Sequence, residues 1–151
     1  HDWEFTENIP TESILDKMDE YGHFNYVRFP HSYMGPDGPS HWDRHDGGHF
    51  EVEDEIDLPL TQCTFYSGNP HIAKISKCRN FYKPLHLQYW TNKTKGTSHL
   101  EKELQQIALS DVKLLGKKGT HKRWGCFVYG QWRDVNHIPP VKHLGDWCRK
   151  Q

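Results

Sequence analysis

The feature that most constrains the fold of this 151-residue chain is a helix marked at both ends between residues 98 and 116. Ser98 and Glu101 have the spacing of a capping box, in which each side chain binds the other residue's backbone amide. Gly116 follows the last apolar residue and is typical of a helix end. The apolar positions between them recur at helical spacing and predict one buried face: Leu100, Leu104, Ile107 and Ala108.

Segments of strand character lie on both sides of this helix, and a second helix is predicted from Thr11 to Tyr21. The predicted strands cover Phe24 to Phe29, Phe50 to Leu58, Cys63 to Tyr66, Ile72 to Ile75, Leu85 to Thr91, and Trp124 to Val135 in two pieces divided near Gly130. This order predicts an α+β fold with an antiparallel sheet and one or two helices packed on it. The length predicts a single compact domain over residues 1–151.

Charge is distributed unevenly along the chain. Residues 1–60 carry 15 acidic and 3 basic side chains, whereas residues 61–151 carry 5 and 16, so the halves have net charges of −12 and +11. The predicted strand from Phe50 to Leu58 contributes an outward stripe of four carboxylates: Glu51, Glu53, Glu55 and Asp57. The two halves either neutralise each other within the fold or present faces of opposite sign to separate partners.

Four cysteines without a C-x-x-C spacing predict that two disulfides staple the fold: Cys63, Cys78, Cys126 and Cys148. The first residue is His rather than Met, which suggests a mature chain whose signal peptide has been removed. Asn92 begins a glycosylation sequon. Together these features predict a secreted glycoprotein, and the alternative is a cytosolic protein with four reduced, buried thiols.

A basic, aromatic stretch from residue 117 to 134 is the predicted binding surface. Cations and flat rings alternate there, and such a surface can contact phosphate or sulfate by charge and a base or sugar by stacking. The residues concerned are Lys117, Lys118, Lys122, Arg123, Trp124, Trp132 and Arg133. In the alternative interpretation the rings pack inward and the lysines lie on a solvated turn.

A histidine cluster, His41, His45 and His49, is the candidate metal site, with zinc or copper as the candidate ion. Asp43 or Asp46 could act as a further ligand or hold an imidazole tautomer. The alternative is a polar turn that leads into the acidic strand. A free amino-terminal His1 also offers an amine and an imidazole to one ion, and this single residue resembles the histidine brace of copper monooxygenases.

Two histidines beside cations could also cleave RNA by general acid and base catalysis, and His121 and His137 are the candidates. The surrounding cations are Lys122, Arg123 and Arg133. The sequence contains no run of about 18 apolar residues, so no membrane span is predicted. The predicted function is therefore a secreted, disulfide-stabilised binding protein that recognises an extracellular protein, a glycan or another polyanion, with nucleic acid included. The alternative is a small secreted hydrolase that is metal-dependent or ribonuclease-like.

Overall fold

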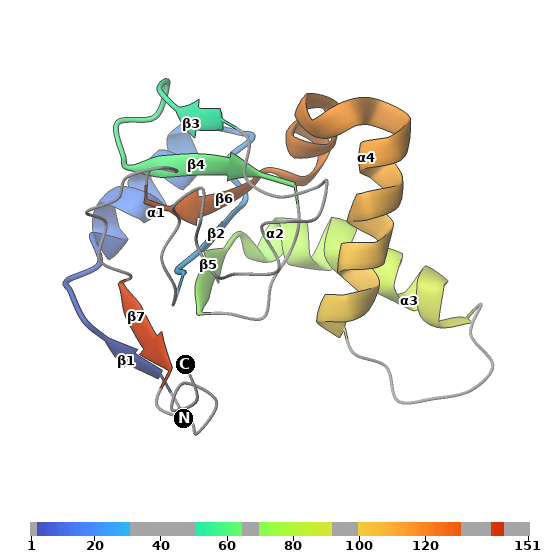
Figure 1. The fold of residues 1–151 in the computed structure, drawn as a ribbon, viewed down its shortest axis with the longest axis horizontal. Coiled ribbons are helices and arrows are strands. Elements are labelled where there is room, and N and C mark those ends of the chain that lie inside the picture. The colour runs from blue at the N-terminus through green and yellow to red at the C-terminus, as the bar shows by residue number, and fades with distance from the viewer. Residues whose placement is uncertain (1–2, 31–50, 65–69, 92–99, 131–139, 144–151) are drawn as a thin grey trace, which may run out of the picture.

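The computed structural model describes residues 3–30, 51–64, 70–91, 100–130 and 140–143, and all structural statements concern these residues. They form a mixed α and β fold built on a five-stranded sheet (Figure 1). In chain order the elements are β1 (Trp3–Phe5), α1 (Thr11–Glu20), β2 (Tyr26–Arg28), β3 (Glu51–Glu53), β4 (Leu60–Cys63), β5 (His71–Ala73), α2 (Ile75–Lys77), η1 (Cys78–Tyr82), α3 (Lys83–Thr91), α4 (Leu100–Trp124), β6 (Cys126–Tyr129) and β7 (Val141–His143).

The sheet has the strand order β3-β4-β6-β2-β5. Three neighbouring pairs are antiparallel, but β2 and β6 at the centre are parallel. The expected antiparallel sheet is therefore present with one parallel pair inside it. A separate antiparallel ribbon joins β1 to β7, so that the first and last described strands lie side by side (Figure 1).

Each face of the sheet has its own apolar core. On one face Val27, Leu60 and Phe127 pack with Ile14 and Met18 of α1. On the other face the residues of the sheet pack with side chains from η1 and α4: Tyr26, Cys63, Cys126 and Val128 with Tyr82, Leu104, Ala108 and Trp124. Because successive strand side chains point to opposite faces, β2 and β6 contribute to both cores. Helix α1 and the group α2 to α4 lie on opposite sides of the sheet (Figure 1).

Helix α4 confirms the predicted helix and its break. Gly116 has φ 70° and ψ 174°, which interrupts the helical conformation where the sequence predicts a helix end. A second helical segment then follows at once and continues to Trp124. The sequence predicts a strand from Trp124 and no helix over residues 117–123, so this segment was not predicted. The predicted helix from Thr11 is also confirmed as α1.

Several strand predictions differ from the structure. The strand predicted to begin at Cys63 ends there instead, as β4 (Leu60–Cys63). Residues 83–91 form α3 rather than a strand, in a helical run that continues without a gap from α2 and η1. Helix α3 packs against α4. Strand β3 covers only three residues of the predicted stripe, and there Val52 is 38% exposed while Glu53 is 5% exposed. The predicted phase of the acidic stripe is therefore wrong at these two residues.

The prediction of two structural disulfides is also wrong. Cys63, Cys78 and Cys126 are free thiols, and Cys148 lies outside the described residues. Cys63 and Cys126 are opposite residues of the β4–β6 ladder. Gly130 and Pro59 form a hydrogen-bonded pair of this ladder, and such pairs alternate with non-hydrogen-bonded ones. Cys63 and Cys126 are therefore also a hydrogen-bonded pair, in which the Cβ atoms are about 5.5 Å apart. A disulfide requires about 3.5 to 4.5 Å, so this position does not favour a bridge.

Candidate functional site

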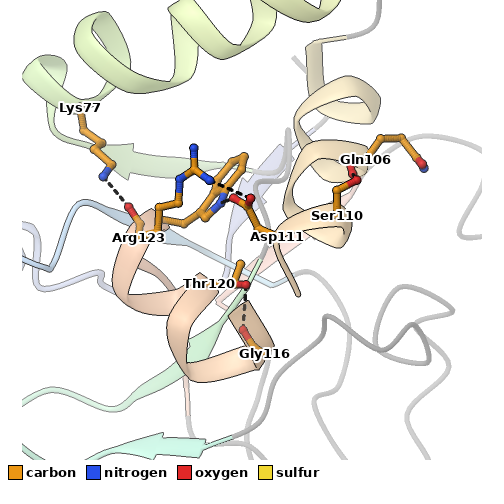
Figure 2. A network of polar contacts seen from close by, with 8 residues as sticks. Lys77, Gln106, Ser110, Asp111, Gly116, Thr120 and Arg123 are labelled. Atoms are coloured by element: carbon orange, nitrogen blue, oxygen red, sulfur yellow. Dashed lines mark hydrogen bonds and ion pairs between the residues drawn. The ribbon is translucent and has the colours of Figure 1, made fainter. Parts of the chain in front are cut away.

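Arg123, the first residue of the candidate site, lies on the second helical segment of α4, which follows the break at Gly116. The Thr120 hydroxyl donates a hydrogen bond to the carbonyl oxygen of Gly116 at 2.8 Å (Figure 2). This contact adds a side-chain hydrogen bond to the first turn after the break. The segment then ends at Gly125, where the chain enters the central strand β6.

Asp111 joins the two segments of α4. One carboxylate oxygen accepts a hydrogen bond from Arg123 Nη1 at 2.8 Å, and the other accepts one from Trp124 Nε1 at 2.8 Å (Figure 2). The carboxylate is buried, so both contacts replace lost solvation. As a result Asp111 fixes the Trp124 ring in the core and holds the Arg123 guanidinium at the surface.

Lys77 and Arg123 meet at one aromatic ring, and we call Lys77, Phe81 and Arg123 the Lys77–Arg123 site. Lys77 Nζ lies 4.1 Å from the ring centroid of Phe81, and Arg123 Cζ lies 5.4 Å from it. Lys77 Nζ also donates a hydrogen bond to the carbonyl oxygen of Arg123 at 2.7 Å (Figure 2). Both cations therefore have favourable contacts with the negative face of the ring.

The surroundings of Lys77 lower its pKa. Burial is the main cause, Cys126 acts in the opposite direction, and the positive charge of Arg123 adds to the lowering. An ammonium group has three donors and a guanidinium has five, so each keeps donors beyond the contacts given above. A phosphate or sulfate oxygen bound between them would relieve the repulsion and accept these hydrogen bonds.

The structure separates the residues of the predicted binding surface. Lys117, Lys118 and Lys122 are exposed, and Lys118 forms an ion pair with Glu51 at 3.1 Å. Trp124 is 0% exposed and belongs to the core, so the prediction of Trp124 as a surface ring is wrong. The reason is its hydrogen bond to a buried carboxylate and its stacking on Tyr82 at 5.7 Å between ring centroids. Trp132 and Arg133 lie outside the described residues.

Lys77 and Phe81 were not among the site residues predicted from the sequence. One signal was present, because residues 71–91 contain no Asp or Glu but include four cations: Lys74, Lys77, Arg79 and Lys83. A helical reading of residues 75–91 would also have placed Lys77 and Phe81 four residues apart on one face. No local pattern connects this segment to Arg123, which is 46 residues from Lys77 in the sequence.

A second candidate site is a cleft of about 570 Å³, which we call the histidine cleft. Its lining includes His23 and His121, and both imidazoles contact the Phe127 ring, at centroid distances of 6.0 and 4.7 Å. His121 Nδ1 lies 3.1 Å from the carbonyl oxygen of Cys63. The other residues of the lining are Glu51, Val52, Glu53, Asp54, Glu55, Gln62, Lys118 and Lys122.

Burial dominates the titration of His121. It lowers the pKa of the imidazole, and the neighbouring His23 acts in the same direction. The Cys63 carbonyl and the Glu53 carboxylate oppose this shift. Glu53 itself is held by two donors, since Oε1 accepts from the Glu55 amide at 2.9 Å and Oε2 accepts from Gln62 Nε2 at 2.8 Å. The arrangement favours a neutral imidazole, the form that a general base requires.

The predicted metal ligands and the glycosylation site cannot be placed in this fold. His1, His41, His45, His49, Asn92 and the candidate acid–base residue His137 all lie outside the described residues. Within the described ranges, no group of three or more His, Cys, Asp or Glu side chains is arranged to hold a metal ion. None of the helices in those ranges is long and apolar enough to cross a membrane.

Comparison with known proteins does not assign the chain to a class. No protein-family model matches the sequence, and searches of curated proteins and of solved structures find no match either. The functional interpretation therefore depends on the two sites and on their chemistry.

Proposed function

We propose that this protein binds an anionic macromolecule, a polymer that carries phosphate or sulfate groups, through the Lys77–Arg123 site. The observation that supports the proposal is the meeting of two cations at the Phe81 ring, held there by the core behind them. Keeping two positive charges close costs free energy unless a counter-charge is present. Asp111 supplies one carboxylate to Arg123, and the bound polymer would supply a further negative charge.

We propose that this protein acts outside the cell, and the Asn92 sequon supports this location. The cysteines do not support it, because Cys63, Cys78 and Cys126 form no disulfide. Polymers with the required chemistry include sulfated glycans and nucleic acids. Both would be recognised by the same charge-assisted hydrogen bonds, so the experiment has to compare them.

The test is a binding titration with heparin and with poly(U) over a series of salt concentrations. Lys77→Met keeps an apolar side chain against Phe81 but removes the charge. We expect it to weaken binding and to reduce the slope of log affinity against log salt by about one. Lys113→Met is the matched control, because Lys113 is an exposed lysine of α4 outside the site. Equal losses in both variants, or no binding of either polymer at low salt, would contradict the proposal.

A ribonuclease-like hydrolase is the second candidate function, and the pairing of His23 with His121 in one cleft favours it. In this reaction neutral His121 would remove the proton of a ribose 2′-hydroxyl, and the 2′-oxygen would attack the adjacent phosphorus. Protonated His23 would give a proton to the departing 5′-oxygen, and Lys122 would stabilise the charge on the phosphorus oxygens. The products are a 2′,3′-cyclic phosphate and a free 5′-hydroxyl, so no water is consumed.

Incubation with RNA, followed by mass analysis of the product ends, tests this second function. Cyclic phosphate ends are expected with the wild type, and His121→Gln and His23→Gln should each lower the rate by about 100-fold or more. Lys113→Met, which removes an exposed cation of α4 outside the cleft, provides the control. Cleavage that persists in His121→Gln would exclude the histidine cleft as the reacting site.

A further inference from the structure

A third feature is a small cleft between the helical run from α2 to α3 and the first segment of α4. Its volume is about 270 Å³, and its lining is Cys78, Arg79, Tyr82, Lys83, His86, Leu100 and Leu104. An apolar cavity of about 150 Å³ is large enough for benzene, so this cleft has room for a ligand of roughly twice that size. It is separate from the residues of the Lys77–Arg123 site.

The wall of this cleft contains an irregular helix. Residues Cys78–Tyr82 form the π-helical turn η1 between α2 and α3. Single π-helical turns within helices are rare and occur frequently at functional sites. Here Cys78 and Tyr82, the first and last residues of the turn, both line the cleft. The irregular turn thus coincides with the cavity wall.

The polar side chains of the cleft occupy two places: His86 lies against Glu103, and Arg79 and Lys83 lie at the mouth. His86 Nδ1 lies 2.9 Å from Glu103 Oε2, and the Glu103 side chain is only 6% exposed. The Glu103 carboxylate therefore has a polar neighbour in His86, beside the apolar lining. Arg79 and Lys83 also line the cleft and are exposed, so they lie at its mouth. Within the described part of the chain neither of them forms an ion pair.

From this arrangement we infer that the cleft binds a small amphipathic anion, an apolar chain or ring that ends in a carboxylate. Leu100, Leu104 and Tyr82 would contact the apolar part, and Arg79 and Lys83 would bind the carboxylate at the mouth. The Cys78 thiol completes the apolar lining, since a protonated thiol behaves as a small hydrophobic group. Burial raises the pKa of Cys78, which keeps the thiol in this form. The inference does not depend on the proposed polymer binding.

The rate at which the Cys78 thiol is alkylated can be used to measure ligand binding in the cleft. Decanoate, kept below its micelle concentration, should slow the alkylation of Cys78 by N-ethylmaleimide at least tenfold at saturation, as followed by peptide mass spectrometry. Cys63 and Cys126 are fully buried, so their modification reports unfolding rather than ligand release. Decanol should protect Cys78 less well, and decylamine should not protect it, because the cations at the mouth repel an ammonium group.

A double variant tests the role of the mouth. Arg79→Gln with Lys83→Gln should require about ten times more decanoate for the same protection, which corresponds to one charged hydrogen bond. Lys113→Gln removes a cation elsewhere on the surface and should leave the protection unchanged. Two results would overturn the inference: the failure of decanoate to protect Cys78, and equal protection by decanol and decanoate. Unchanged protection in the double variant would equally overturn the role of the two cations.

Discussion

Gly125 shows how much a single residue contributes to this fold. It has φ 65°, a conformation that side chains other than glycine rarely adopt. A Cβ atom at this position would overlap the carbonyl oxygen of His23 and crowd the side chain of Asn25. The carbonyl oxygen of Gly125 also accepts hydrogen bonds from the amides of Asn25 and Tyr26. Gly125 therefore holds the end of α4 close to the chain that enters β2.

We predict that Gly125→Ala lowers the free energy of unfolding by at least about 2 kcal/mol, through both strain and overlap. Urea denaturation measures this directly. Gly22→Ala is the matched control, because a Cβ at Gly22 meets no atom within 4 Å. Similar losses in the two variants would show that the close approach to His23 does not limit stability.

The buried imidazole of His121 should make the free energy of unfolding depend on pH. Burial lowers the pKa of the imidazole in the folded protein below its ordinary value near 6.5. Proton binding therefore favours the unfolded chain, and the stabilisation present above pH of about 6.5 is lost as the pH falls. His121→Gln should show a shallower loss of stability between about pH 6.5 and 5 than the wild type. Parallel curves for the two proteins in this range would contradict the assignment.

At the scale of elements, the edge strand β3 is attached to β4 by a buried carboxylate. Glu53 binds Gln62 of β4 and also the Glu55 amide in the following turn. Glu51, two residues earlier, is exposed and pairs with Lys118 of α4. The two carboxylates therefore differ in surroundings although they belong to the same three-residue strand. Their substitution should separate a buried hydrogen-bonding role from a surface ion pair.

Glu53→Ala should lower the free energy of unfolding by about 1 to 3 kcal/mol, because the buried donors lose their acceptor. Glu51→Ala, the control in the same strand, should cost less than about 1 kcal/mol, as expected of an exposed ion pair. Chemical denaturation of both variants measures the difference. A larger loss for Glu51→Ala would show that the surface pair, rather than the buried carboxylate, fixes the strand.

On the scale of the whole molecule, the ion pairs of the described residues lie mostly within one half of the chain. Among the described residues, the Glu51–Lys118 pair is the one ion pair that joins the two halves. The other three lie within a single half: Lys17–Glu20, His86–Glu103 and Arg123–Asp111. In the described part of the chain, Lys118 of α4 is therefore the basic side chain that pairs with the acidic half.

The thiols provide a prediction for the whole chain. Denaturation without a reductant should expose reactive thiols at Cys63, Cys78 and Cys126, since the structure has all three free. In the native protein the half-buried Cys78 should react with a thiol reagent long before the two fully buried residues. Quantification of labelled peptides before and after denaturation checks both statements. A disulfide between any two of these residues would contradict the fold described here.

The sequence by itself determined those features that depend on near neighbours in the chain. Helix α1, the first segment of α4 and its break at Gly116 were predictable because glycine conformation and helical periodicity act within one or two turns. Ser98 of the predicted capping box lies outside the described residues. The presence of both helices and strands followed from the same local patterns. The Lys117–Arg123 stretch was recognised as basic from composition, and the structure keeps Arg123 in a candidate site.

Only the tertiary structure decided which of these residues meet. Trp124 lies inside because Asp111, 13 residues away, accepts its indole hydrogen, and Phe81 takes its place as the surface ring beside the cations. The pairing of Lys77 with Arg123 and of His23 with His121 follows from how α4 packs behind the sheet. Such contacts join residues that are distant in sequence, and their free energy depends on burial and on partners that no local pattern contains.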